Sequence, residues 1–179
     1  MSTVTHGPRA STLTGIERHF GADEIIVSKT DTKGRITYAN RTFLRVAEYS
    51  ERELLGAPHS IIRHPDMPGC VFQLLWETIS SGDEIFAYVV NRTKSGGHYW
   101  VLAHVTPTFD EAGEIVGYHS NRRNPTRQAV TAAEGLYACL RSIEDGAASP
   151  ASGRKAARAH LDSVLRDAGV SYGEFVFSL

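Results

Sequence analysis

The chain has 179 residues, of which 41% are hydrophobic, so it can bury one sizeable core but has little left for a second full domain. The 19 Lys and Arg side chains nearly balance the 20 Asp and Glu side chains, which argues against a nucleic-acid-binding surface. The two cysteines are too few and too widely spaced for a disulfide framework or a zinc site, and they favour a cytoplasmic location. No secretory signal is visible, and no apolar run approaches the ~18 residues of a membrane span, so direct membrane insertion is not expected.

The first 40 residues predict a flexible start, a short helix and a hairpin. Residues 1–10 are polar and are expected to be disordered, and Thr14-Gly-Ile-Glu17 has the spacing of a capping box, which predicts a leading helix within residues 1–22. Two β-branched runs, 25–31 and 35–39, flank a turn at Gly34 and predict two paired strands. Asn40 follows and is suited to cap a helix.

The middle of the chain predicts helices followed by three strands. Ser50-Glu-Arg-Glu53 is a second capping box, and apolar residues at helical spacing over 71–79 predict a core-facing helix. Three β-type runs then cover 86–90, 98–109 and 114–121, separated by glycine-containing turns. This order predicts an α+β fold in which short helices gather on one face of an antiparallel sheet.

Residues 126–179 predict a helical extension with an apolar tail. One helix is expected from the capping box Thr131-Ala-Ala-Glu134 to Ile143, and a second over 154–168 after a linker at 145–153. The tail, 170–179, is too apolar to remain in solvent, so we expect it to dock on its own domain or on a partner.

Several motifs together resemble the PAS domain of the aerotaxis-receptor type. They are Asp31…Gly34-Arg-Ile-Thr-Tyr-Ala-Asn40, Gly56, Trp76, Asn91-Arg92, Gly97-His-Tyr-Trp100 and Gly117-Tyr118, and the most specific is the run Pro58-His-Ser-Ile-Ile-Arg-His-Pro-Asp-Met-Pro68. The resemblance implies a PAS fold over residues 23–125, with a five-stranded antiparallel sheet and flanking N- and C-terminal helices. It also implies non-covalent FAD between sheet and helices, whose redox state is passed to a signalling partner.

The chemistry of eight side chains suits such a cofactor, because a flavin ring needs apolar walls and a few placed polar groups. Amides suit the ring edge, Arg63 and two histidines suit a pyrophosphate or a reduced, anionic flavin, and two tryptophans suit aromatic walls. Asp66 is suited to orient Arg63 or to bond a ribose hydroxyl. The candidate cofactor-binding residues are Asn40, His59, Arg63, His64, Asp66, Trp76, Asn91 and Trp100. Three structural readings stay open: an Arg63–Asp66 ion pair in a turn, Trp76 in the core, and Asn40 as a helix cap only.

The chain departs from that family at two places. Where the family has a tryptophan before the Asn-Arg pair, this chain has Ile85, and Phe86 or Tyr88 is the possible substitute. No membrane span or chemoreceptor signalling region follows the domain. We therefore expect the signal to pass to a separate, chemoreceptor-like protein, and the flanking helices to form a homodimer.

The expected function is that of a flavin-based redox or oxygen sensor in aerotaxis, energy taxis or related bacterial signalling, and not that of an enzyme. No nucleophile, phosphate-loop or metalloprotease motif is present. Three alternatives remain at this stage. They are a cofactor-free PAS dimerisation or interaction module, a blue-light sensor of the LOV kind that uses Cys70, and a haem sensor that uses His98, His104 or His119.

Overall fold

The computed structural model describes residues 12–179 and is built around one antiparallel sheet of five strands in the order β2-β1-β5-β4-β3. The strands are β1 (Ile26–Thr30), β2 (Ile36–Ala39), β3 (Ile85–Arg92), β4 (His98–Phe109) and β5 (Ile115–Arg123). Each lies within a few residues of a predicted run, and the predicted α+β fold with a five-stranded antiparallel sheet is confirmed. The strand order places β1, from the start of the chain, directly beside β5.

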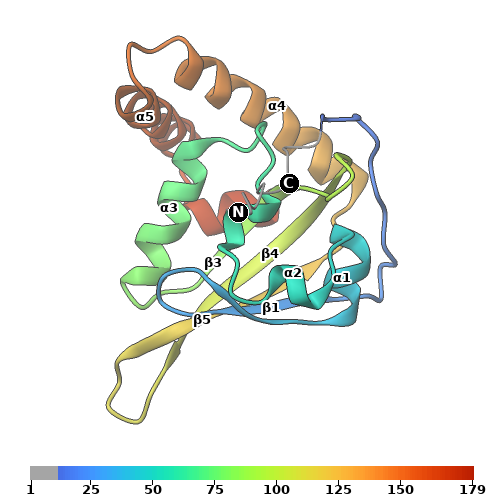
Figure 1. Ribbon diagram of the computed structural model, residues 1–179. Helices are drawn as coiled ribbons and strands as arrows, with labels where there is room; N and C mark the ends of the chain where they lie inside the picture. Colours follow the sequence, from blue (N-terminus) through green and yellow to red (C-terminus); the bar gives the residue numbers. More distant parts are fainter. Residues whose placement is uncertain (1–11) are drawn as a thin grey trace, which may run out of the picture.

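The helical elements between β2 and β3 cover one face of this sheet (Figure 1). They are α1 (Arg41–Ala47), α2 (Glu51–Leu54), the 3-10 helix η1 (His59–Ile62) and α3 (Gly69–Ser80). Asn40 caps α1 as predicted, because its Oδ1 accepts the amide of Phe43 at 3.0 Å. The same carboxamide accepts the amide of Val27 and donates to the carbonyl of Ile25, so it also ties α1 to the start of β1.

Three further helices follow the sheet: α4 (Arg127–Asp145), α5 (Pro150–Ala168) and α6 (Tyr172–Ser178). The first begins earlier than the predicted capping box at Thr131, because the Thr126 side chain already accepts the amide of Ala129 at 3.1 Å. A short turn over residues 146–149 joins α4 to α5, and this α4–α5 hairpin packs against α3. No helix within residues 12–179 is long and apolar enough to cross a membrane.

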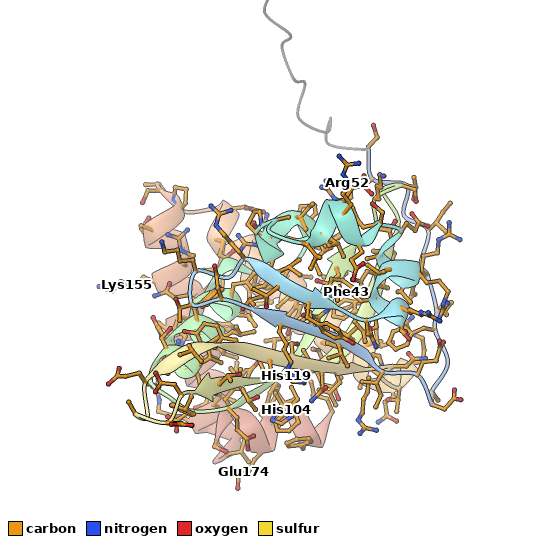
Figure 2. The ribbon with its side chains drawn as sticks, turned by 60° about the horizontal axis from the view of Figure 1, so that its bottom comes forward. Phe43, Arg52, His104, His119, Lys155 and Glu174 are labelled. Atoms are coloured by element: carbon orange, nitrogen blue, oxygen red, sulfur yellow. The ribbon has the colours of Figure 1, made fainter. Side chains whose placement is uncertain are left out.

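The apolar tail docks on its own domain, as one of the two expected options. Helix α6 packs against β3, with Val176 buried and the ring of Phe177 4.7 Å from that of Phe86. Figure 2 shows the sheet from the side opposite α1 and α3, with His104 and His119 on the strands in front and α6, marked by Glu174, beside them.

The predicted leading helix is wrong, because residues 12–22 are extended. Glu17 forms a parallel bridge with His98. The amide of Thr14 donates to Gly96 O at 2.9 Å, and that of Arg18 to His98 O at 2.7 Å. These contacts hold the segment against the β3–β4 turn, and they satisfy the Thr14 amide, one of the two amides that the capping box would otherwise serve. The predicted disorder of residues 1–10 lies outside the described residues, and the domain limits 23 and 125 stay predictions.

Candidate functional site

A largely apolar cavity of about 220 Å³ lies between α3, the segment around η1 and the inner face of the sheet. The inner face contributes side chains from β1, β3, β4 and β5, and α3 contributes aromatic and aliphatic ones. The wall residues with apolar side chains include Ile62, Phe72, Leu75, Trp76, Ile79, Val89, Ala103, Val105 and Tyr118. Such a slot, with few polar groups, is suited to a flat apolar ring.

The main charged group buried in this cavity wall is Arg122 on β5, which is 2% exposed. Its Nε donates to Ser120 Oγ at 3.0 Å, its Nη2 contacts Ser28 Oγ and His59 Nε2, and its guanidinium lies 4.8 Å from the centre of the Phe43 ring. Its Nη1 has no partner, and no acidic side chain within residues 12–179 pairs with it. Burial lowers the pKa of Arg122 to about 10, so the group remains charged at neutral pH.

His59 is the neutral partner of this guanidinium. Burial, together with the positive charges of Arg122 and Arg63, lowers the pKa of His59 to about 3. The unprotonated Nε2 therefore accepts a hydrogen bond from Arg122 at 2.8 Å. The His59 ring also stacks on Phe43 of α1, labelled in Figure 2, at 6.1 Å between ring centres. The result is a buried positive charge whose hydrogen-bond partners are all neutral, an arrangement that favours a ligand carrying acceptor oxygens or negative charge.

Four of the predicted site residues meet at this cavity: His59, Arg63, Trp76 and Asn91. The Trp76 ring stands edge-on to Tyr118 at 5.5 Å. Asn91 is 3% exposed and lines the cavity. The backbone of Arg63 bridges that of Asn91, which fixes the motif segment against β3.

The other four predicted residues lie away from the cavity. Asn40 uses its carboxamide fully as cap and tie, and Trp100 lies on the opposite face of the sheet, where it packs on Tyr137 at 5.9 Å. His64 is buried, and its Nδ1 accepts the amide of Asp66 at 3.2 Å. The Asp66 carboxylate is 79% exposed and lies beside His64 rather than Arg63, so the expected Arg63–Asp66 ion pair is not formed.

Ile85, at the position of the family tryptophan, does not line the cavity, although it is in phase with Val89 on β3 and pairs with Val105, which does line it. Strand alternation turns Val89 and Asn91 inward and Phe86 and Tyr88 outward. The Phe86 ring stacks on His104 at 4.1 Å, on the outer face. Neither Phe86 nor Tyr88 therefore replaces the missing indole inside the cavity.

The residues that the light-sensor and haem alternatives require also lie elsewhere. Cys70 is buried outside the cavity, and burial together with Glu144 raises the pKa of its thiol to about 12. His98, His104 and His119 do not line the cavity either. Within residues 12–179 no group of three or more His, Cys, Asp or Glu side chains is arranged to hold a metal ion.

The polar residues of the cavity that were missed from the sequence include Ser28, Ser120 and Arg122. The predicted last strand ended at Asn121, whereas β5 continues to Arg123. A strand two residues longer would have placed Arg122 in phase with Tyr118 and Ser120, on the inner face. An arginine at an inward-facing strand position was the available signal.

Comparison with known proteins agrees with this geometry. Residues 36–122 match the family described as PAS fold. The chain is 40% identical over 144 residues to the aerotaxis receptor of Escherichia coli, covering 80% of this chain and 26% of the receptor. It is 29% identical over 100 residues to the nitrogen fixation regulatory protein of Klebsiella pneumoniae, covering 56% of this chain and 20% of that protein.

The chain therefore contains a PAS domain, and its sequence relatives include the aerotaxis receptor. The dark-state structure of the LOV domain of the blue-light photoreceptor Aureochrome1 superposes with a TM-score of 0.55 at 23% identity, covering 66% of this chain and 86% of that one, which supports the fold alone. The chain spans about a quarter of the length of the aerotaxis receptor and a fifth of that of the nitrogen fixation regulator.

Proposed function

We propose that this PAS domain is a non-enzymatic sensor that binds FAD, with the flavin ring in the cavity between α3 and the sheet, and reports its redox state to a signalling partner. The observation that carries the proposal is the buried guanidinium of Arg122, which has an unpartnered Nη1 at the wall of an apolar cavity. The likeness to the aerotaxis receptor supports a sensing role with oxygen or cellular redox poise as the stimulus. In this proposal the chain forms a homodimer and signals to a chemoreceptor-like protein.

The residues present fit a flavin. The apolar wall suits the flat ring, and Arg122 and Asn91 supply donors for its polar edge. When bound, the flavin supplies an electron acceptor whose charge changes on reduction. Arg122 then stabilises negative charge in the cavity, and neutral His59 holds the guanidinium without cancelling its charge.

The test compares two substitutions on adjacent residues of β5. Arg122→Met removes the buried donor, whereas Arg123→Met changes an exposed residue whose side chain points to the other face. A hydrogen bond to a charged group contributes about 1.5–3 kcal/mol, so Arg122→Met is expected to weaken flavin binding by about 10- to 100-fold. Arg123→Met is expected to bind flavin like the original chain.

The readout is the absorption spectrum of the purified chain, recorded before and after dithionite, followed by a flavin titration. Two visible bands that bleach on reduction and return in air support the proposal. A colourless chain that takes up no flavin on reconstitution contradicts it and favours the cofactor-free interaction module. Equal flavin affinity in Arg122→Met and Arg123→Met would contradict the assignment of the ring to this cavity.

A further inference from the structure

A second cleft adjoins the flavin cavity. It has a volume of about 470 Å³ and lies between the segment 63–69 and the turn of the α4–α5 hairpin. Arg63 and Phe72 line both spaces, so the cavity and the cleft meet at these two side chains. The Arg63 guanidinium lies over the Phe72 ring, 4.4 Å from its centre. The second cleft is more polar than the cavity, and most of its charged side chains come from the α4–α5 hairpin.

The acidic side chains of this cleft are already engaged. Glu144, at the end of α4, accepts the amides of Gly69 at 3.0 Å and Cys70 at 2.7 Å, and thereby caps α3. Arg141 pairs with Glu144 at 3.3 Å and with Asp145 at 3.1 Å. Both carboxylates thus have hydrogen-bond partners, and the three arginines that line the cleft, Arg63, Arg141 and Arg154, exceed its carboxylates by one positive charge.

Two arginines of the cleft remain without an acidic partner among residues 12–179: Arg63 and Arg154. Arg63 comes from the motif segment and Arg154 from α5, so they reach the cleft from two different elements. Two guanidiniums that share a cleft with fully engaged carboxylates favour an anionic ligand, and their planar donor sets match phosphate oxygens.

Close packing holds Arg154 at the edge of this cleft. A Cβ atom at Gly69 would lie 3.0 Å from Cδ of Arg154, so the stem of the arginine lies flat against the first residue of α3. A Cβ atom at Gly153 would lie 2.5 Å from Glu144 O, so α5 approaches the end of α4 more closely than any other residue would allow. Arg154 is accordingly half-buried rather than extended into solvent.

We propose that this cleft binds the diphosphate-bearing tail of the flavin dinucleotide, with Arg63 and Arg154 as its counter-ions. The inference rests on the proposed function, because the ring would occupy the adjoining cavity. That cavity, at about 220 Å³, lies below the ~300–1,000 Å³ of sites that enclose drug-sized ligands, so a dinucleotide requires the neighbouring space. The α4–α5 hairpin thus contributes directly to cofactor binding, and it selects FAD over flavins without a diphosphate.

The test measures dissociation constants of the flavin-free full chain for riboflavin and for FAD by fluorescence titration. Arg154→Gln is compared with Lys155→Gln, the same change at the exposed neighbouring residue that points away from the fold in Figure 2. We expect Arg154→Gln to weaken FAD binding about tenfold and to leave riboflavin binding unchanged. Lys155→Gln should leave both unchanged.

Three results would overturn the assignment. The first is unchanged FAD affinity in Arg154→Gln, and the second is an equal loss for riboflavin and FAD, which would mean that Arg154 acts on the fold. The third comes from titration with ADP: we expect ADP to compete with FAD but not with riboflavin. ADP that binds alongside FAD would mean that the cleft takes a separate nucleotide. Failure of the original chain to bind riboflavin or FAD would instead remove the proposed function itself, and the tail assignment with it.

Discussion

The buried histidine of the cavity makes the stability of the protein depend on pH in a specific range. In the folded chain the pKa of His59 is lowered from 6.5 to about 3, because the ring is buried and faces the positive charges of Arg122 and Arg63. An unfolded chain takes up a proton at this histidine below pH 6.5, whereas the folded chain does not until about pH 3. The free energy of unfolding is therefore unaffected by His59 above pH 6.5, and it decreases progressively as the pH falls from 6.5 toward 3.

At pH 4 the unfolded chain is about 2.5 pH units below its histidine pKa of 6.5, while the folded His59 is still neutral. Protonation of the unfolded state therefore lowers the free energy of unfolding by roughly 3 kcal/mol. The change to make is His59→Gln, since a glutamine oxygen can still accept the hydrogen bond from Arg122 and cannot be protonated in this range. We expect this variant to be less stable than the original chain at pH 7. Between pH 7 and pH 4 it should lose about 3 kcal/mol less than the original chain does.

The assay is urea unfolding of the full chain, without added ligand, at pH 7, 5.5 and 4. Burial also lowers the pKa of His64, but His64 is present in both proteins and cancels in the comparison. The exposed His160→Gln is the control and should keep the pH dependence of the original chain. Parallel free-energy profiles for His59→Gln and the original chain would refute the reasoning, because they would mean that His59 titrates equally in both states.

Two further substitutions test how the site is held. Gly34 has φ +74° and a Cβ there would lie 2.9 Å from the Trp76 ring, whereas Gly113 has φ +83° and open space around it. Both alanine variants should lose about 1 kcal/mol of unfolding free energy, because alanine is strained in the left-handed backbone region. Only Gly34→Ala should also shift the tryptophan fluorescence and weaken flavin binding. Identical behaviour of the two variants would contradict the contact between Gly34 and Trp76. Glu144→Gln leaves one of the two α3 amides without its acceptor and should cost about 1–3 kcal/mol in urea unfolding, against less than about 0.5 kcal/mol for the exposed Asp145→Asn. Equal losses in these last two variants would mean that the cap contributes nothing beyond surface charge.

The sheet could be predicted from the sequence because its signals are local. Turn residues such as Gly34 and Gly113 require a positive φ, and they separate runs whose alternation already distinguishes the two faces. The leading helix failed for the opposite reason. Its capping-box pattern is local, but the segment instead donates the amides of Thr14 and Arg18 to residues 96–98, which lie about 80 positions further along the chain.

The cavity also depends on contacts between residues that are far apart in the sequence. His59 and Arg63 of the motif run line the cavity, but the buried charge that His59 contacts comes from Arg122, on the last strand. Ser28 and Arg122 are 94 residues apart in sequence, and they meet only because β1 pairs with β5. Strand order is a property of the whole sheet, so no short motif reveals this partnership. The resemblance to PAS domains implied a five-stranded antiparallel sheet, and neither its strand order nor the inward phase of Arg122 on β5 was predicted.

The same segment that borders the cavity also anchors the C-terminal helices. The motif run enters the cavity wall at His59 and Arg63 and ends at Gly69, where Glu144 of α4 accepts the first two amides of α3. The structure adds a directional, charge-assisted contact only six residues beyond Arg63, and such contacts are sensitive to small displacements of the donor amides. The two amides that Glu144 accepts thus link the motif segment directly to the end of α4.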